Sequence, residues 1–440
     1  MRATSDMSDY MFMLESHLSA DQNRVLEQVQ AAAGVAGVNL FLTGGGMRDM
    51  LGGFRIRDLD FSVEGHALKL AQALEEQGAR TLAVDENRRS AELVFPNGVT
   101  AQVAMSRKER YAKTGAKPQV TPATIQEDLR GRDFTVNAMA LSLNRASRGL
   151  LLDPTNGLAD LGRREMRSAH PYVFYDDPAR LLRLARLRVR LAFTVEERTR
   201  MQYDNARAAH LETLIPSREL LDELKRIAAE PTPSEALQAL NQDGLLALFS
   251  PALDGPGLNL HALTRIEKAA RLVESANIAV APQFGAFLHA LTAKLPPKEK
   301  SGLFKSLDIP KAEIDQMRNL EPRARKLEQA LQSARVKKPS HVYQILADAP
   351  VGDVVFLLGH SAERVVQERI RNYLQKYLPA MQEVAPSEWA ALEGQPGTPK
   401  YIRSRQAFLA SRLDVRPRKP PEPEPESPTP VEALARGRLR

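Results

Sequence analysis

The chain has 440 residues, enough for about three domains, and its 43% hydrophobic and 26% charged residues are typical of a globular protein. The absence of cysteine excludes a disulfide scaffold, thiolate metal ligands and a cysteine nucleophile, and it suits a reducing compartment. The formal net charge of +7 is modest, so it indicates a polyanionic partner only where basic residues cluster. We expect a cytoplasmic protein without a membrane segment, because no stretch is apolar enough to span a bilayer and the beginning of the chain is acidic.

The first 150 residues mix helical and strand patterns. An irregular leader at residues 1–20 precedes a helix that begins near Asp21, with Ser19 as its N-cap. A second helix is predicted at residues 66–77. Apolar runs and alternation predict strands at residues 38–43, 56–63, 81–84, 90–96 and 99–105.

From residue 176 onward the pattern is almost entirely helical, with Pro and Gly residues between the helices. A final segment, residues 416–440, alternates Pro and Glu, cannot bury apolar surface and is expected to be disordered. The predicted helices cover residues 178–191, 217–229, 233–242, 260–275, 284–293, 314–334, 341–347, 361–377 and 401–413.

A glycine-rich turn and a pair of carboxylates carry the strongest chemical signal. The strand at 38–43 runs into Gly44–Gly46, where backbone N–H groups can approach a phosphate because no Cβ intervenes. Asp58 and Asp60 are two residues apart on the next strand, so both carboxylates project from the same face. Two oxygen ligands beside a phosphate cradle are suited to Mg²⁺-assisted phosphoryl or nucleotidyl transfer.

Four motifs in order resemble the class II tRNA nucleotidyltransferase/poly(A) polymerase family of polymerase-β-like nucleotidyltransferases. The resemblance is dense over residues 38–193 and fades by 253. It implies an α+β fold, with a polymerase-β-like nucleotidyltransferase head of mixed sheet and helices followed by an all-helical neck, body and tail. The motifs are GGGMRDMLGG with DLDF (44–53 and 58–61), EDLRGRDFTVNAMA (127–140), the stretch at 152–161 and DDPARLLR (176–183).

The resemblance also implies a domain order and a reaction. The reaction would be template-independent addition of C and A to the 3′ end of tRNA from CTP and ATP, with release of pyrophosphate. Asp58 and Asp60 would be the catalytic residues and would hold two Mg²⁺ ions, while Gly45 and Arg48 would bind the triphosphate and Arg132 the nucleotide. The predicted domains are a leader at 1–20, the head at 21–150, a base-recognising neck at 151–230, an RNA-binding helical body and tail at 231–415 and the disordered tail at 416–440.

Asp177 and Arg180 match the pair that reads the base edge in this family. A carboxylate accepts from an exocyclic amino group and a guanidinium donates to a ring acceptor. Adenine and cytosine both offer that pattern, whereas uracil and guanine present the opposite polarity.

An arginine run follows this pair. Arg183 and Arg186 match nucleotide-site arginines of the family, and with Arg190 they form one stripe at i, i+3 and i+7 of a helix. We expect Arg188 and Arg190 to be surface or RNA-backbone contacts.

Three positions depart from the family pattern. Gln102 stands where a third acid is common, and Gly131 replaces the first arginine of a usual pair. The order Arg218–Glu219 inverts the usual Glu–Arg, which we interpret as a surface change. The neutral Gln102 leaves open a degenerate, non-catalytic RNA-binding protein, although the intact set of Asp58, Asp60, Asp177 and Arg180 argues against it.

Basic clusters at residues 318–338 and 369–377 predict contacts with RNA phosphates. A poly(A) polymerase is the second hypothesis, but residues 63–69 lack the basic stretch that follows the carboxylates in those relatives. Enzymes that add only CC or only A remain open, and the sequence gives no oligomeric state.

Overall fold

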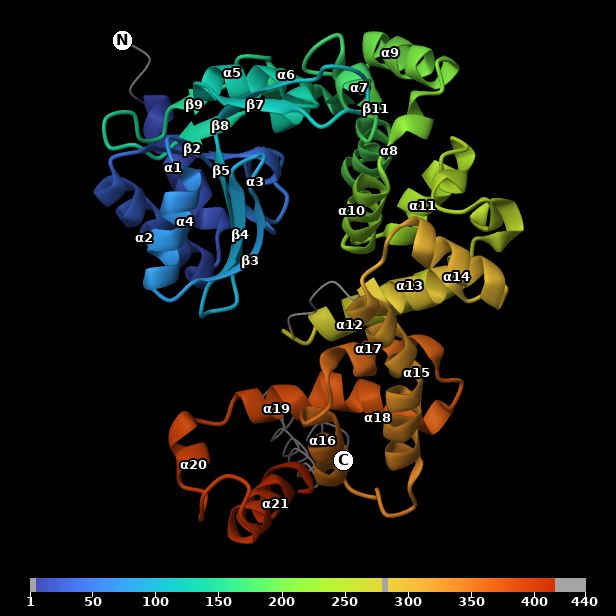
Figure 1. Ribbon diagram of the computed structural model, residues 1–440. Coiled ribbons are helices and arrows are strands. Elements are labelled where there is room, and N and C mark those ends of the chain that lie inside the picture. The colour runs from blue at the N-terminus through green and yellow to red at the C-terminus, as the bar shows by residue number, and fades with distance from the viewer. Residues whose placement is uncertain (1–4, 279–283, 416–440) are drawn as a thin grey trace, which may run out of the picture. The chain divides into compact units, whose positions relative to one another are not determined.

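The computed structural model describes residues 5–278 and 284–415, so the predicted disordered tail lies outside the described residues (Figure 1). The chain forms two compact units. The first comprises Met1–Glu267 and Pro282–Met317, and the second Lys268–Ala281 and Arg318–Arg440.

A seven-stranded mixed sheet forms the centre of the head, in the order β3-β4-β5-β2-β1-β8-β9. β2 and β5 pair in parallel, and the other neighbours pair antiparallel. The five predicted strands are confirmed with ends shifted by up to three residues. The strands are β1 (Asn39–Thr43), β2 (Leu59–Glu64), β3 (Arg80–Asp85), β4 (Ser90–Val94), β5 (Thr100–Met105), β8 (Ala140–Ser142) and β9 (Leu151–Leu152).

The sheet buries one face against helices α2 (Ala20–Ala36) and α4 (Ala67–Glu76). On β2 this face carries Leu59, Phe61 and Val63, all buried. Successive side chains on a strand point to opposite faces, so Asp60 and Ser62 lie on the other face. The alternation of β2 therefore separates the core from the candidate site.

The expectation of an irregular leader at residues 1–20 is wrong for the part that the structure describes, since residues 5–17 form a helix. Helix α1 covers Ser5–His17, and Met11, Leu14 and Leu18 join the core of the head. These three apolar side chains recur at helical spacing, so one face of the segment packs on the core, while Phe12 beside them is exposed. The predicted Ser19 N-cap is confirmed, with a complete capping box at the start of α2.

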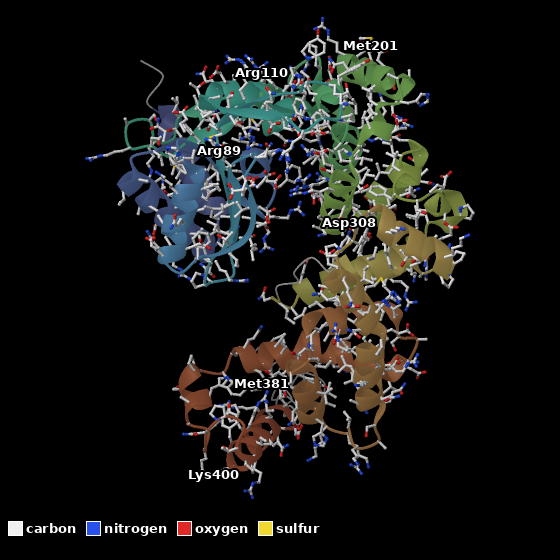
Figure 2. All side chains as sticks on the ribbon, viewed as in Figure 1. Arg89, Arg110, Met201, Asp308, Met381 and Lys400 are labelled. Carbon is white, nitrogen blue, oxygen red and sulfur yellow. The ribbon has the colours of Figure 1, made fainter. Side chains whose placement is uncertain are left out.

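Several elements of the head and the neck were not predicted from the sequence. Strands β6 (Arg107–Arg110) and β7 (Gln119–Pro122) form a two-stranded hairpin, and β6 ends at the exposed Arg110 (Figure 2). The others are α3 (Gly44–Leu51), α5 (Ile125–Arg130), α6 (Gly157–Arg163) and α7 (Val173–Asp176).

The neck is mainly helical, but it is not all-helical as expected. The two-residue strands β10 (Glu165–Met166) and β11 (Thr194–Val195) pair in parallel. The later helices of the first unit are α8 (Arg180–Leu191), α9 (Glu197–Ala208), α10 (Ser217–Ala228), α11 (Pro233–Gln242), α13 (Phe284–Thr292) and α14 (Pro297–Ser306), while α12 (Leu260–Glu274) and α15 (Lys311–Gln332) run across the unit boundaries.

The described part of the second unit is helical. The helices of this unit after α15 are α16 (Pro339–Ala347), α17 (Val351–His360), α18 (Arg364–Asn372), the π-helical turn η6 (Tyr373–Tyr377), α19 (Leu378–Gln382), α20 (Pro386–Ala390) and α21 (Pro399–Leu413).

No single described helix is long and apolar enough to cross a membrane. The helices α16 and α17, which are bent by 116° relative to each other, meet the length and composition criteria only as a pair.

Candidate active site

The glycine turn joins β1 to the N-terminus of α3. Gly44 has φ +65°, a left-handed conformation that side chains disfavour. The backbone N–H of Gly45 donates to Oδ2 of Asp60 at 3.3 Å. The turn thus brings the helix N-terminus directly to the predicted catalytic carboxylate.

The two predicted catalytic carboxylates are close enough to interact. Asp58 is exposed just before β2, and Asp60 is half-buried within it. Burial and the neighbouring Asp58 raise the pKa of Asp60 from its ordinary value to about 6, although Arg132, the N–H of Gly45 and Arg48 oppose this shift. Two neighbouring carboxylates repel each other when both are ionised, so a cation bound between them would stabilise their ionised forms.

Gln102 is the direct cross-strand neighbour of Asp60 through the parallel pairing of β2 and β5. Glu92 on β4 is in turn the partner of Gln102. Cross-strand partners share a face of the sheet, so the side chains of Asp60, Gln102 and Glu92 stand in one row. The neutral Gln102 therefore separates Asp60 from the next carboxylate along the row.

The donor set fits a hard divalent cation. Asp58 and Asp60 supply carboxylate oxygens, and the repulsion that raises the pKa of Asp60 is what a cation relieves. Within residues 5–278 and 284–415, no group of three or more His, Asp or Glu side chains is arranged to bind a metal ion. Mg²⁺ is commonly held by one or two carboxylates together with phosphate oxygens and water.

Arg132 lies beside the carboxylates, as predicted for a nucleotide ligand. Its guanidinium is held by Asp128 at 2.8 Å and donates to the hydroxyls of Thr43 and Ser62 at 3.2 and 3.0 Å. Its Nη1 lies 3.5 Å from the position that a Cβ on Gly44 would occupy. Arg132 therefore places a fixed positive charge next to the glycine turn.

Arg48 does not project freely toward a triphosphate. It is 3% exposed, and it donates through Nε and Nη2 to Oδ1 of Asp49 and through Nη1 to Oδ1 of Asn137. Arg190 of α8 donates to the other oxygen of Asp49. Arg48 is thus part of a buried charge network, and its predicted role in triphosphate binding needs these bonds to rearrange.

Arg183 and Arg186 converge on one buried carboxylate, Glu223 of α10. Arg183 donates to Oε1 and Arg186 to Oε2, both at 3.1 Å. Arg183 also donates to Asp133 at 2.9 Å, and Arg186 to Glu230 at 2.7 Å. The predicted helical stripe is confirmed, but its charges are met by acids from other segments of the first unit.

Asp133 connects this network to the glycine turn. Burial alone would raise its pKa, but Arg183 and Arg180 outweigh burial and lower it to about 2. The carboxylate also accepts from Asn137, which in turn accepts from Arg48. Asp133 and Asn137 therefore link the arginines of the neck to those of the head.

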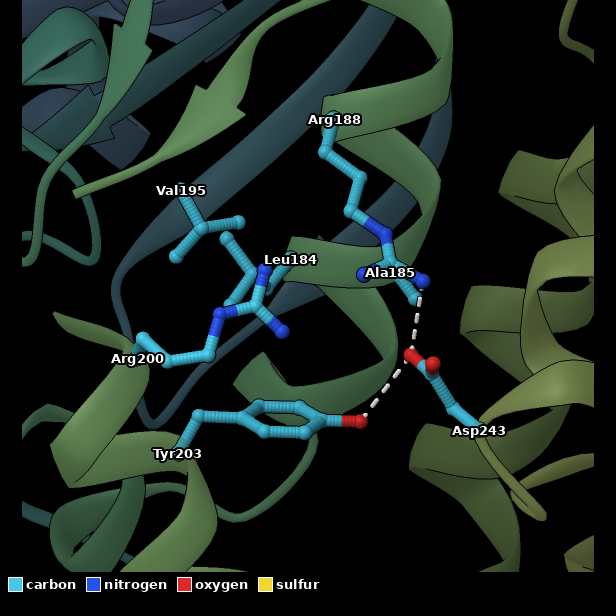
Figure 3. A pocket seen from close by; sticks show the side chains of 7 residues that line it. All are labelled: Leu184, Ala185, Arg188, Val195, Arg200, Tyr203 and Asp243. Atoms are coloured by element: carbon cyan, nitrogen blue, oxygen red, sulfur yellow. Dashed lines mark hydrogen bonds and ion pairs between the residues drawn. The ribbon is translucent and has the colours of Figure 1, made fainter. Parts of the chain in front are cut away.

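Arg190 and Arg188 are half-buried and paired with acids, so the expectation that they are surface residues is wrong, while contact with the RNA backbone stays a prediction. The side chain of Arg190 is 14% exposed and pairs with Asp49 and Glu230. Arg188 donates to Oδ2 of Asp243 at 2.9 Å, and the hydroxyl of Tyr203 donates to the same oxygen at 3.1 Å (Figure 3). Acids distant in the sequence bind both arginines.

The structure brings Asp177 and Arg180 together at the start of α8. Both residues are buried, and Nε of Arg180 lies 3.6 Å from Oδ2 of Asp177. Oδ1 of Asp177 accepts from the N–H of Ala179 at 3.0 Å. The terminal nitrogens of Arg180 contact Nε2 of His170, the carbonyl of Val173 and the carbonyl of Gly131.

One hydrogen-bond donor of the pair Asp177 and Arg180 has no acceptor. Nε of Arg180 is buried without a hydrogen-bond partner in the described structure. A buried donor left in this way has a free-energy cost, which a ligand with an acceptor would relieve.

Glu219 is a site residue that the sequence interpretation missed. It lies in the first turn of α10 and is half-buried, and burial together with the negative charge of Asp177 raises its pKa to about 7. The inverted Arg218–Glu219 order is therefore not a surface change. The inversion was the available signal, but the sequence alone does not show that α10 packs beside Asp177.

Some basic residues of the second unit are bound by acceptors within the unit, and others are exposed. Arg323 forms a bidentate pair with Asp353, and Arg369 donates to the carbonyls of Leu331 and Val336. The exposed members of the predicted RNA-binding clusters include Arg318, Lys326, Arg335, Lys337 and Arg371.

Residues 40–167 match the family model described as the poly A polymerase head domain. The chain is 36% identical to a CC-adding tRNA nucleotidyltransferase of Deinococcus radiodurans, over 50% of this chain and 56% of that protein. It is 35% identical to an A-adding tRNA nucleotidyltransferase of Halalkalibacterium halodurans, over 53% and 55% respectively. The chain thus spans about half the length of these curated relatives.

A longer match is to the multifunctional CCA protein of Thioalkalivibrio sulfidiphilus, which is 32% identical over 63% of this chain and 70% of that protein. Among solved structures, an apo CCA-adding enzyme gives a TM-score of 0.54 at 24% identity, covering 93% of this chain and 96% of that chain. The Thermotoga maritima CCA-adding enzyme, solved in complex with tRNA, gives 0.50 at 23% identity over 93% and 96%. These structures share the mixed-sheet head and the mainly helical remainder.

Proposed function

This chain belongs to the tRNA nucleotidyltransferase/poly(A) polymerase family and is a nucleotidyltransferase, and we propose that it adds C and A to the 3′ end of tRNA from CTP and ATP. The observation that carries the proposal is the placement of Asp60 against the N–H of Gly45 with Asp58 beside it. Relatives that add A, CC or the whole CCA sequence all match this chain, so tRNA is the shared substrate.

The chemistry follows from what the carboxylates and the turn can do. Asp58 and Asp60 would hold two Mg²⁺ ions, which when bound would lower the pKa of the 3′-hydroxyl and neutralise the triphosphate. Arg132 would supply a fixed positive charge where charge develops on the α-phosphate, and the N–H of Gly45, which donates to Oδ2 of Asp60, would hold that carboxylate in place. The 3′-oxygen forms the new bond to the α-phosphorus and pyrophosphate leaves.

Base selection would fall to Asp177 and Arg180. The unpartnered Nε of Arg180 and Oδ2 of Asp177 form an adjacent donor and acceptor. Cytosine and adenine present an amino donor beside a ring acceptor, which matches this order. Arg183 and Arg186 would support the pair by fixing α8 through Glu223.

The second unit would hold the rest of the tRNA. Its exposed arginines and lysines can contact phosphates without reading sequence. A solved relative carries tRNA, which supports this assignment. The proposed place of action is the cytoplasm, where tRNA and nucleoside triphosphates meet.

The test is extension of tRNA that ends before CCA, after C or after CC, with each labelled triphosphate and Mg²⁺, read at nucleotide resolution. Extension of all three substrates to CCA is the expected result. Extension that stops at CC identifies a CC-adding enzyme, and extension of only the tRNA that already ends in CC identifies an A-adding enzyme. Long adenylate tails identify a poly(A) polymerase. No incorporation with any substrate would leave the non-catalytic RNA-binding alternative.

A further inference from the structure

We propose that His170 is a positioning residue that holds the guanidinium of Arg180 in the orientation in which it reads the base. The inference rests on the proposed function, in which Asp177 and Arg180 select the nucleotide, and deepens it. It concerns a side chain that precedes α7, outside the motif that contains Asp177 and Arg180.

The terminal nitrogens of Arg180 meet three acceptors. Nη1 lies 3.2 Å from Nε2 of His170 and 3.4 Å from the carbonyl of Val173, and Nη2 lies 3.4 Å from the carbonyl of Gly131. The bond to His170 is the shortest of these three and the one made by a side chain. The three bonds occupy the ends of the guanidinium, so its Nε remains for a ligand beside Asp177.

The direction of the bond between Arg180 and His170 fixes the proton on the imidazole. A guanidinium carries donors and no acceptor, so Nε2 of His170 must accept, and the proton of the neutral ring lies on Nδ1. Nδ1 lies 3.9 Å from Oδ2 of Asp176, whose negative charge favours a proton on that nitrogen. A protonated His170 has donors at both ring nitrogens and cannot accept from Arg180.

The surroundings of His170 keep its ring neutral. The side chain is half-buried, and burial and the charge of Arg180 lower its pKa to about 4, against the opposing charge of Asp133. The charged groups around the ring are thus Arg180, Asp133 and Asp176. From about pH 5 upward, most molecules therefore hold the form of His170 that can accept from Arg180.

The backbone next to His170 is tied to another segment of the first unit. Ala169 donates its N–H to the carbonyl of Asp133 at 2.9 Å, directly before His170. The acceptor is therefore held in place on one side, and Arg180 is held in α8 on the other. Loss of the imidazole would leave Nη1 with the longer bond to the carbonyl of Val173, and the guanidinium could turn away from the base.

The first test is the position of the proton on His170 in the wild-type protein. It uses NMR on protein with isotope-labelled histidine, in which the ring signals of His170 are assigned by their loss in His170→Gln. They should show a protonated Nδ1 and an unprotonated Nε2 between about pH 5.5 and pH 8. A proton on Nε2 in this range overturns the inference, because that nitrogen could not accept from Arg180.

The second test measures kcat and KM for each nucleotide that the wild type adds to tRNA. His170→Leu removes the acceptor at similar side-chain volume, and His170→Asn is too short to reach the guanidinium. Each should raise KM for both CTP and ATP about five- to tenfold with little change in kcat, because the base contacts lie away from the reacting phosphate. His170→Gln can place its Oε1 near the position of Nε2 and should restore a KM close to that of the wild type.

His66→Leu is the matched control, the same change at an exposed histidine before α4, and both constants should follow the wild type. Circular dichroism identifies the variants that fold. A wild-type KM in His170→Leu or His170→Asn overturns the inference, and so does a His170→Gln variant that is impaired as strongly as they are. Failure of the proposed function is distinct, because the wild type would then incorporate neither nucleotide while NMR still reports the proton on His170.

Discussion

The position that a Cβ on Gly44 would occupy lies 2.9 Å from Oδ2 of Asp60. That distance is shorter than carbon–oxygen contacts allow, and the oxygen belongs to a carboxylate held by the N–H of Gly45. The glycine is therefore required both by its φ of +65° and by the approach of the carboxylate.

Gly44→Ala should destabilise the protein by at least about 1–2 kcal/mol from the left-handed backbone alone. It should also lower nucleotide incorporation, because Asp60 must move. Gly34→Ala is the control, since nothing lies within 4 Å of its Cβ position on α2, and it should stabilise slightly. Chemical unfolding and incorporation rates measure both, and wild-type values in Gly44→Ala would contradict the close approach.

Asp58→Ala and Asp60→Ala should each lower nucleotide incorporation about 100-fold or more, because a charge-stabilising group at the reacting phosphate is lost. Binding of tRNA should change little, since the basic residues proposed to contact it lie in the second unit. Incorporation and filter binding on the same preparations provide the comparison. Full incorporation in both variants would eliminate the two-carboxylate mechanism.

Asp177→Ala should relax base choice more than it slows CTP incorporation. The lost carboxylate normally opposes the carbonyl oxygen of U, and a buried mismatch is worth roughly 1–3 kcal/mol, on the order of 10- to 100-fold. Arg180→Ala should weaken the use of every triphosphate. In a competition between CTP and UTP, a wild-type preference in Asp177→Ala would assign base selection to other residues.

Glu223→Gln should destabilise the first unit by about 1–3 kcal/mol, because Arg183 and Arg186 lose their shared carboxylate and keep only Asp133 and Glu230 as partners. Glu235→Gln, an exposed acid in the first turn of α11, should change stability by no more than about 0.5 kcal/mol. Urea unfolding at neutral pH gives the two differences. Equal stabilities would show that Asp133 and Glu230 alone balance the charges of the two arginines.

His170 should make stability sensitive to mild acid. Burial and Arg180 lower its pKa to about 4, although Asp133 opposes this, and its Nε2 lies 3.2 Å from Nη1 of Arg180. Between about pH 6.5 and pH 4 the unfolded chain binds the proton more readily, so stability falls as the pH falls through this range. His170→Gln should lose part of that dependence, whereas the exposed His66→Gln should retain it. Parallel Tm curves for His170→Gln and wild type would rule out this contribution.

The sequence predicted five of the seven strands of the sheet from their apolar runs and alternation, and it missed the short strands β8 and β9. Leu59, Phe61 and Val63 mark the buried face of β2, and Asp60 follows on the other face. The helix α11 was predicted with the bounds observed. The hairpin strand β6 and the helix α9 were missed, because both are highly charged and carry little apolar periodicity.

The site was predicted less completely. The glycine turn, Asp60, Asp177 and Arg180 follow from local motifs and are brought together in two clusters. The acids that pair with the neighbouring arginines do not follow from local motifs, since Glu223 binds Arg183 across 40 residues of sequence. Acids on helices are usually solvated, so only the fold distinguishes Glu219 and Glu223 from surface residues.

The pairing of Arg190 with Asp49 has a consequence for protein engineering. Asp49 is buried in α3 and bound by Arg48, so without Arg190 it would lose one of its two cations. A hybrid protein that joins this head to the helical segments of a relative would therefore leave Asp49 with Arg48 as its single remaining cation if the graft ended at residue 150. The smallest transferable segment should extend through Glu230, which also binds Arg57 of the head and Arg186.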